Sequence, residues 1–304
     1  MKLGFNSAIL PDLSLQEVFD FADTNQFRGV EVMCWPKGKA DRRYAGITHI
    51  DMSELDDEKT ESIKDLQAEK GIEISALGYY PNPLDPDREK RAFYIDHIKK
   101  VIEGASKLDI NRMNTFIGKD PAASISENME DFKKTWPDII QFAEDRGVKI
   151  GIENCPMFFS MDEWPGGKNL ASSPKIWAEM FSIIDSEYFG LNYDPSHLVW
   201  QRMDYVKPIY DFKDKMFHIH IKDAKFFQDR FDQVGILATP LEYHVPKIPG
   251  YGDIDWGAFF CALSEIGYKD FCAIEVEDYA FEDSLEERKA AILQSQAYLR
   301  QWIV

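Results

Sequence analysis

Four β-rich segments of the sequence each carry, at or near their ends, a side chain that can bind a metal ion or move a proton. These residues are Glu153, Asp194, the pair His218 and His220, and Glu275. If the carboxylates converge on one point, they repel one another, and isolated buried charge is costly. A bound cation is the economical solution. Oxygen-rich ligation with one nitrogen suits Mn²⁺, Mg²⁺ or Co²⁺, and Zn²⁺ also fits.

Each of these residues also has an ordinary structural interpretation. An acid at the end of a strand often completes a turn or caps the next helix, and Asp194 followed by Pro195 fits a turn. His218 alone is more typical of a hydrogen-bonded core histidine than of a ligand. Four successive strands that each end in a ligand type are hard to obtain by chance, so the set as a whole carries the inference.

The segments that must position these side chains alternate between β-rich runs and longer amphipathic runs. We expect strands at 3–9, 29–34, 72–80, 112–118, 148–154, 189–194, 216–222 and 271–276. Apolar residues at helical spacing predict helices at 14–25, 88–108, 125–147, 173–184, 255–267 and 283–304. Ser14 and Glu17 have the spacing of a capping box at the first helix.

Strict alternation of strands and helices predicts an α/β fold, with a parallel sheet covered by helices. Eight units in 304 residues fit a single (β/α)₈ TIM barrel, which we expect to span 1–304 as one domain. No GxGxxG follows the first strand, so the dinucleotide-binding alternative lacks its fingerprint. The long non-periodic segments 35–55, 156–172 and 223–254 would then lie over the C-terminal, catalytic face of the barrel.

The direction of the histidine side chains follows from strand alternation. Successive side chains of a strand point to opposite faces, so His218 and His220 share one face, and Ile219 and Ile221 share the other. We expect the isoleucines to pack under the helices and both histidines to point into the barrel.

The composition favours a globular protein with a large core and opposes nucleic-acid binding. Hydrophobic residues make up 44% of the chain, while a net charge of −18 runs against binding to phosphates. The four cysteines form no CxxC pair, which favours reduced thiols and a cytoplasmic protein. We expect no signal peptide and no membrane association, because no apolar stretch approaches the ~20 residues of a membrane helix.

Several motifs of the chain resemble those of a known family. The segments GIENCP, NYDPSH, HIHIKDAK, PGYGDIDW and AIEVED look like motifs of the xylose isomerase-like TIM barrels, specifically the sugar phosphate isomerase/epimerase group. The resemblance covers essentially the whole chain, including EVMCWP, LGYYPNPLD and NTFIG. The group includes ketose 3-epimerases, hydroxypyruvate isomerase-like proteins and inosose dehydratase-like proteins.

The resemblance implies roles for particular residues. It implies one divalent ion per chain, with Mn²⁺ as the first expectation, held by Glu153, Asp194, His220 and Glu275. It makes His197, in the D-P-S-H motif, a substrate-binding residue beside the metal. Further substrate contacts are expected from Lys222, Trp35, Glu31 and Tyr80.

The resemblance also implies a mechanism with a clear physical basis. In the ketose epimerases the two glutamates, here Glu153 and Glu275, form the acid/base pair. A divalent ion bound by a carbonyl and a neighbouring hydroxyl stabilises the developing enediolate while the carboxylates remove and return the proton. The leading hypothesis is therefore an isomerase or epimerase of a sugar or keto-sugar. The alternative is a lyase or dehydratase acting on a 3-keto-glycoside or inosose.

The sequence departs from the ketohexose 3-epimerases at two positions. Those enzymes place another acid after the first glutamate and an arginine after the histidine, where this chain has Phe159 and Phe226. Lys222 or Lys225 could replace the arginine, although lysine is no geometric equivalent. The aromatic residues expected at the mouth favour stacking on a sugar ring or glycoside; they are Trp35, Tyr79, Tyr80, Phe158, Phe159, Trp164 and Trp200.

Two other classes of function are weaker. DNA repair in the manner of endonuclease IV requires a trinuclear zinc set richer in histidine and a basic face, but the chain has six histidines and a charge of −18. A non-catalytic sugar-binding barrel would have no need of both glutamates. The expected partner is a small sugar or sugar derivative, and the sequence leaves homo-oligomerisation open.

Overall fold

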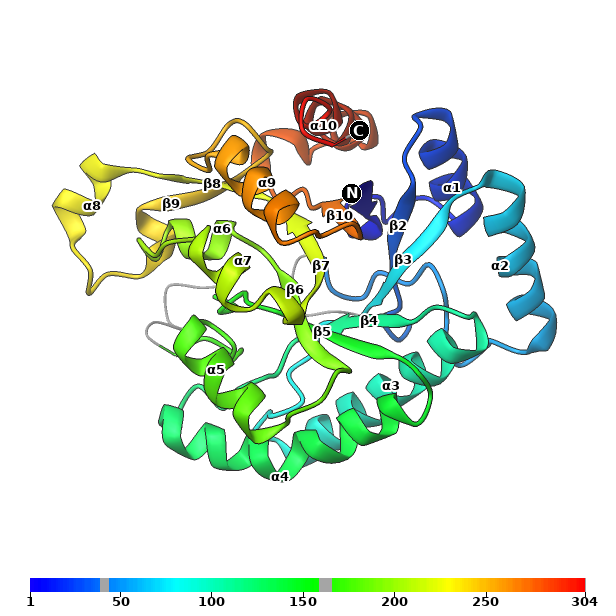
Figure 1. Cartoon of the computed structure of the whole chain (residues 1–304), viewed down its shortest axis with the longest axis horizontal. Coiled ribbons are helices and arrows are strands. Elements are labelled where there is room, and N and C mark those ends of the chain that lie inside the picture. Colours follow the sequence, from blue (N-terminus) through cyan, green and yellow to red (C-terminus); the bar gives the residue numbers. More distant parts are fainter. Residues whose placement is uncertain (39–43, 159–165, 304) are drawn as a thin grey trace.

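A computed structural model describes residues 1–38, 44–158 and 166–303. Within these residues, eight parallel strands close into a barrel in the order β1-β10-β7-β6-β5-β4-β3-β2 (Figure 1). The strands are β1 (Lys2–Asn6), β2 (Gly29–Met33), β3 (Glu73–Gly78), β4 (Arg112–Thr115), β5 (Lys149–Glu153), β6 (Phe189–Tyr193), β7 (Met216–Ile221) and β10 (Phe271–Ile274). The predicted fold and all eight predicted strands are confirmed.

Helices cover the outside of the barrel and alternate with its strands (Figure 1). The longer helices are α1 (Leu15–Thr24), α2 (Asp57–Lys70), α3 (Arg88–Lys107), α4 (Ile125–Glu144), α5 (Pro174–Ile183), α9 (Trp256–Glu265) and α10 (Leu285–Leu299). Shorter helices are α6 (Ser196–Val199), α7 (Lys207–Asp211) and α8 (Gln228–Val234). Single 3₁₀ turns lie at Ser7–Ile9, Lys213–Lys215, Pro240–Glu242 and Tyr279–Phe281.

The first helix begins as its sequence predicts. The Glu17 N–H donates to Ser14 Oγ at 3.3 Å, and the Ser14 N–H donates to Glu17 Oε2 at 2.8 Å, which completes the capping box. Helix α2 did not stand out in the sequence. Only Thr60 and Leu66 of this helix are buried, so it lacks the apolar stripe that reveals an amphipathic helix.

Strand β7 confirms the expected alternation. Ile219 and Ile221 are fully buried in the hydrophobic core between strands and helices. His218 and His220 are equally buried but point into the barrel, where His218 Nε2 lies 3.1 Å from Ser75 Oγ of β3. This contact crosses the interior between strands that are not neighbours in the sheet.

The segment 223–254 forms an antiparallel hairpin of β8 (Asp223–Phe226) and β9 (His244–Lys247), which extends with α8 away from the barrel (Figure 1). Asp223 fixes its base, because its carboxylate accepts hydrogen bonds from the Gly250 N–H at 3.0 Å and from Trp256 Nε1 at 3.0 Å. A Cβ at Gly252 would lie 2.0 Å from Asp223 Oδ1, so this position requires glycine. The PGYGDIDW motif therefore anchors the hairpin.

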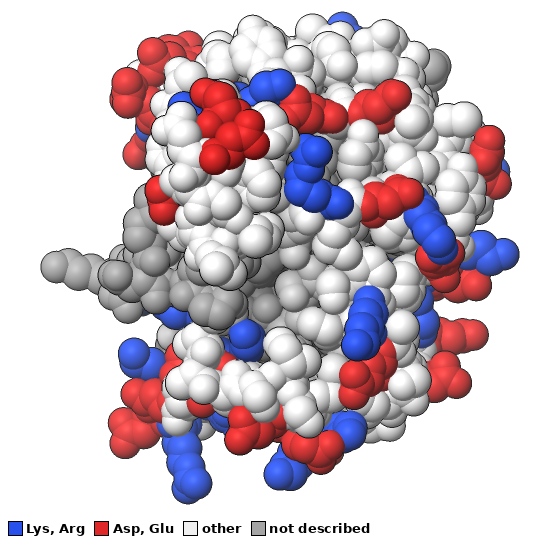
Figure 2. Space-filling model, turned by 90° about the vertical axis from the view of Figure 1, so that its left-hand side faces the viewer, with Lys and Arg blue, Asp and Glu red and all other residues white. Residues whose placement is uncertain are grey.

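Among the described residues, no helix is both long enough and apolar enough to cross a membrane. On the face of the molecule shown in Figure 2, Lys and Arg side chains are interspersed with Asp and Glu. The coloured residues of that face show no continuous basic stripe.

Candidate metal centre

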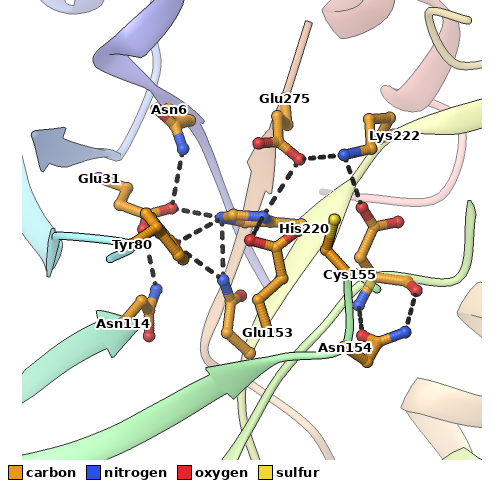
Figure 3. A network of polar contacts seen from close by, with 12 residues as sticks. Asn6, Glu31, Tyr80, Asn114, Glu153, Asn154, Cys155, His220, Lys222 and Glu275 are labelled. Atoms are coloured by element: carbon orange, nitrogen blue, oxygen red, sulfur yellow. Dashed lines mark hydrogen bonds and ion pairs between the residues drawn. The ribbon is translucent and has the colours of Figure 1, made fainter. Parts of the chain in front are cut away.

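Four predicted ligands meet at the C-terminal end of the barrel. Glu153 ends β5, Asp194 follows β6, His220 lies in β7 and Glu275 follows β10. One potential ligand atom of each lies within 4.8 Å of the other three. His220 Nδ1 is 3.3 Å from Glu275 Oε2 and 3.9 Å from Glu153 Oε2, and Figure 3 shows these side chains directed at a common centre.

Two buried atoms of this set have charged neighbours but no hydrogen bonds among the described residues: Lys222 Nζ lies 3.1 Å from Asp194 Oδ2, and Glu275 Oε2 lies 3.3 Å from His220 Nδ1. Asp194 Oδ2 and His220 Nδ1 are buried and make no hydrogen bond to any residue that the structure describes. The other oxygen of Asp194 accepts the Ser196 N–H at 2.8 Å, which fixes the direction of the carboxylate. Buried polar atoms without hydrogen bonds are rare in native proteins, and this donor set matches that of a divalent metal site.

Lys222 supplies positive charge at the edge of the site. Its Nζ lies 3.1 Å from Asp194 Oδ2, 2.7 Å from Glu275 Oε2 and 2.9 Å from Glu277 Oε2. Burial alone would lower the pKa of Lys222, but Asp194, Glu275 and Glu277 raise it well above its ordinary value. Glu277 was not singled out in the sequence, although it follows Glu275 by two residues in the AIEVED motif.

The carboxylates of the cluster have different electrostatic environments. Burial and the neighbouring Glu275 raise the pKa of Glu153. Burial also opposes ionisation of Asp194, but Lys222 and His197 outweigh it and lower the pKa of Asp194 to about 2. Burial also raises the pKa of Glu275, but Lys222 and His220 lower it by more, so the pKa of Glu275 lies below the ordinary range.

The other side of the His220 ring is held by Glu31. His220 Nε2 lies 2.5 Å from Glu31 Oε2, while Glu31 Oε1 accepts hydrogen bonds from Tyr80 Oη and, at 3.1 Å, from Asn114 Nδ2 (Figure 3). When Nε2–H donates a hydrogen bond to a carboxylate, the proton stays on Nε2 and the lone pair of Nδ1 can face a ligand. Burial opposes protonation of His220, but Glu31 and Glu275 raise its pKa well above the ordinary value.

This arrangement differs from the expectation that Glu31 contacts substrate. Glu31 is fully buried beneath His220 and does not line the cavity above the four ligands. Its position is that of a residue that orients His220. The signal in the sequence was an acid in the middle of the buried strand GVEVM, because a charged residue at such a position must be paired.

His197 lies beside the four ligands on the short helix α6. Its Nε2 is 3.2 Å from Asp194 Oδ2 and 3.4 Å from Glu153 Oε1. Burial opposes protonation of His197, but Cys155 and Asp194 help to raise its pKa well above the ordinary value. Asn154 supports this corner, because its side chain accepts the Asp194 N–H and donates to the Asp194 carbonyl, both at 2.8 Å.

A cavity of about 510 Å³ opens above these residues. It is lined by both glutamates of the proposed acid/base pair and by four of the expected substrate contacts, which are His197, Lys222, Trp35 and Tyr80. The long segments after β2, β5 and β7 contribute to its walls, as the sequence predicted. The remaining wall residues include Phe158 and Trp200.

Three aromatic or basic side chains lie elsewhere than expected. Tyr79 is fully buried in the core, where its ring packs against Trp35 and His97, so its placement at the mouth was wrong. Lys225 pairs with the exposed carboxylate of Asp253, and Phe226 packs against Phe231 and Tyr243 in the hairpin. Phe159 and Trp164 lie outside the described residues.

The hairpin supplies a wall that was not foreseen. Leu241, His244, Val245 and Pro246 line the cavity. The His244 ring stacks on Trp200 with 4.9 Å between centroids, and His244 Nδ1 lies 2.6 Å from the Pro240 carbonyl oxygen. Burial is the largest of the causes that lower the pKa of His244 to about 4. No periodic pattern in 223–254 could have shown this wall, because each hairpin strand has only four residues.

Comparisons with known proteins agree with this architecture. The profile of the family described as xylose isomerase-like TIM barrel matches residues 19–302. An uncharacterized protein of Methanocaldococcus jannaschii is 24% identical over 282 residues, which covers 90% of this chain and 83% of that protein.

Two solved structures share the fold over the whole chain. The IOLI protein, described with a bound zinc atom, has a TM-score of 0.74 at 19% identity and covers 100% of this chain and 99% of its own. A D-tagatose 3-epimerase-like protein has a TM-score of 0.69 at 20% identity, with 100% of this chain and 97% of its own covered.

Proposed function

Because the chain belongs to the xylose isomerase-like TIM-barrel family, we propose that it is a divalent-metal-dependent isomerase or epimerase of a sugar or keto-sugar. One observation carries this proposal. Glu153 and Glu275 reach the same centre from β5 and β10, which are separated by two strands of the barrel, and both line the cavity. The likeness to a D-tagatose 3-epimerase-like protein and to a zinc-bearing protein supports it.

In this proposal Glu153, Asp194, His220 and Glu275 hold the ion. Three carboxylates and one imidazole suit Mn²⁺ first, and Mg²⁺, Co²⁺ or Zn²⁺ also fit. When bound, a divalent ion supplies positive charge that stabilises negative charge developing on substrate oxygens. Glu31 orients His220 from below, through the proton of Nε2.

Glu153 and Glu275 transfer the proton. Both carboxylates face the cavity from different sides, so one can remove the proton α to a carbonyl and the other can return it. Return to the opposite face of the same carbon gives epimerisation, and return to the neighbouring carbon gives isomerisation. His197, Lys222, Trp35 and Tyr80 line the same cavity and are the proposed substrate contacts.

The walls of the cavity favour a substrate with an apolar face. Trp35, Phe158 and Trp200 contribute aromatic surface, on which the C–H face of a sugar ring can pack. The arginine of the ketohexose 3-epimerases has no counterpart at Phe226, which lies in the hairpin packing. Lys222 takes the place nearest the ligands, as a point charge rather than a planar fork.

Solvent exchange tests the proposal directly. In D₂O, the manganese-loaded protein should incorporate deuterium at the α-carbon of a keto-sugar substrate. Glu153→Gln and Glu275→Gln keep an oxygen ligand and nearly the same shape but lose a good base, so each should lower the rate at least ~10²-fold while retaining metal. Glu69→Gln, at an exposed position on α2, is the matched control and should leave both properties unchanged.

The outcomes separate the candidate reactions. One glutamine variant that still exchanges deuterium without epimerising would identify the face served by each glutamate. Near wild-type turnover in both variants would show that these glutamates are ligands only and would contradict the mechanism. Release of a leaving group, or formation of a double bond, without recovery of an epimer would assign the dehydratase alternative instead.

A further inference from the structure

We propose that the mouth of the barrel contains a second metal position, built from Glu153, Cys155 and His197 and selective for a soft cation such as Zn²⁺ or Cd²⁺. It lies beside the first position and shares the Glu153 carboxylate with it. One ligand atom of each of these three residues lies within 4.8 Å of the other two. None of the roles proposed above uses Cys155.

The end of β5 brings a carboxylate and a thiol close together. Glu153 is the last residue of β5 and Cys155 follows it by two positions, and one potential ligand atom of each lies within 4.8 Å of the other. Figure 3 shows the Cys155 side chain pointing from this strand end toward the region that holds Glu153. Cys155 also lines the cavity, so a cation can reach its sulfur.

The two oxygens of Glu153 face different imidazoles. Oε2 lies 3.9 Å from His220 Nδ1, on the side of the first position. Oε1 lies 3.4 Å from Nε2 of His197, the imidazole that forms the second group with Cys155. A carboxylate with its oxygens divided in this way can bridge two cations, which in two-metal sites are about 3.5–4 Å apart.

His197 supplies the independent observation that a ligand is missing. The residue is only 8% exposed, yet its Nε2 makes no hydrogen bond to any residue in the described ranges. The oxygens of Glu153 and Asp194 lie at 3.4 and 3.2 Å, as ion-pair contacts that lack the geometry of a hydrogen bond to Nε2. A buried ring nitrogen aimed at a carboxylate and a thiol is the environment of an imidazole ligand.

The sulfur of Cys155 is held in place by its own loop. The Met157 N–H donates to Cys155 Sγ at 3.3 Å, and Met157 itself adopts a positive φ of 62°. One such contact leaves the sulfur with further acceptor capacity toward a metal. The geometry is therefore set before any cation arrives.

The two positions should prefer different metals. The first offers three carboxylates and one imidazole, which suit hard ions such as Mn²⁺ and Mg²⁺. The second offers thiolate, imidazole and carboxylate, and the thiolate selects soft ions. Occupancy of the second position would use Glu153 Oε1 and so compete with proton transfer by Glu153. That consequence rests on the proposed function, whereas the metal position itself does not.

Titration of the whole apo protein with Cd²⁺ tests the proposal without any substrate. Two equivalents should bind per chain, and one of them should produce a thiolate-to-cadmium charge-transfer band. A protein preloaded with Mg²⁺ at the first position should still bind Cd²⁺ with the same band. Cys155→Ser should bind only one equivalent of Cd²⁺, at the first position, and should show no charge-transfer band.

The other cysteines provide the control. Cys34 and Cys272 are buried, and Cys261 is exposed on α9, so Cys261→Ser should keep the band. Cys155→Ala repeats the test if the serine variant fails to fold, as judged by circular dichroism. A band that survives in Cys155→Ser, the absence of any band, or a single equivalent that carries the band would each overturn the second position. The proposed function is tested by deuterium exchange, which these cadmium titrations do not measure. Either proposal can therefore fail without the other.

Discussion

The two sides of the His220 ring differ in how completely they are bonded. Beneath the ring, Nε2 meets Glu31, whose carboxylate is held in turn by Tyr80 and Asn114. Above the ring, Nδ1 is fully buried and faces Glu275 Oε2 at 3.3 Å, but it has no hydrogen bond of good geometry to any described residue. The lower side is built to fix the position of the ring. The upper side is the side on which we propose that the metal ion binds.

The neighbouring histidine of the same strand shows that depth in the barrel decides the role. His218 is two residues earlier on the same face, and both of its nitrogens have partners, with Nδ1 2.9 Å from Asn192 Oδ1 and Nε2 3.1 Å from Ser75 Oγ. Burial, Arg112 and His220 lower the pKa of His218 well below its ordinary value. His218 is therefore a bonded core histidine, as its simplest interpretation suggested, and His220 is the ligand candidate.

The largest effect should come from removing a ligand on the upper side. Asp194→Ala deletes a buried carboxylate whose Oδ2 lacks a hydrogen bond, so manganese affinity should fall by more than the ~10–100-fold expected for a supporting residue. Isothermal titration with Mn²⁺ measures this loss. Asp270→Ala is the matched control, because Asp270 pairs with Arg112 at the opposite end of the barrel. Equal affinity in Asp194→Ala and wild type would remove Asp194 from the metal site.

A smaller loss should follow from a change on the lower side. Glu31→Gln replaces the charged acceptor of the His220 Nε2 proton, and we expect manganese affinity to fall ~10–100-fold without loss of the fold. Tyr80→Phe removes only one hydrogen bond to Glu31 and should cost less. If Glu31→Gln binds Mn²⁺ as tightly as the wild type, the Glu31 contact only supports the fold and does not affect metal affinity.

The upper side was easier to predict from the sequence than the lower side. Acids and imidazoles at the ends of parallel strands must meet at one rim, so the barrel and the convergence of these side chains followed from alternation and strand order. The choice of His220 rather than His218 as the ligand came from the family resemblance. The role of Glu31 depends on which strand faces β2 across the interior of the barrel. That arrangement is set by how the barrel closes and cannot be read from the spacing of residues. The β8–β9 hairpin was missed because its two strands are short and separated by 17 residues, 227–243.

A change at His197 tests whether this residue contacts the substrate rather than the metal ion. His197→Ala should leave manganese affinity at the first position nearly unchanged, because His220 and three carboxylates remain. It should raise the KM for a keto-sugar about tenfold, through loss of a hydrogen bond that a charged group can make. Steady-state kinetics with saturating Mn²⁺ measure the change. Loss of Mn²⁺ with an unchanged KM would mean that the roles of Asp194 and His197 are exchanged.

The smallest effect concerns His244, the imidazole of the hairpin wall. The surroundings of this ring lower its pKa to about 4, chiefly through burial and also through the charges of His197 and Lys222. The pKa of an unfolded histidine is about 6.5, so the unfolded chain takes up a proton first as the pH falls. The stability that depends on neutral His244 is therefore complete above pH 6.5 and is lost as the pH falls from 6.5 to about 4.

The expected size of the His244 effect follows from linkage. Between pH 7 and pH 5.5, the free energy of unfolding of the wild type should fall by about 1 kcal/mol more than that of His244→Gln, which cannot titrate. Urea unfolding of both proteins at the two pH values measures the difference. Burial, with Trp200 stacked on one face of the ring, favours the neutral form and outweighs the Pro240 carbonyl at Nδ1, which favours the protonated form. If the free energy of unfolding depends on pH in the same way for both proteins, His244 protonates as readily in the folded state as in the unfolded chain, which would require the hairpin to move away from the ring. The His244 side of the mouth would then be a movable wall, in contrast to the rigid network beneath His220.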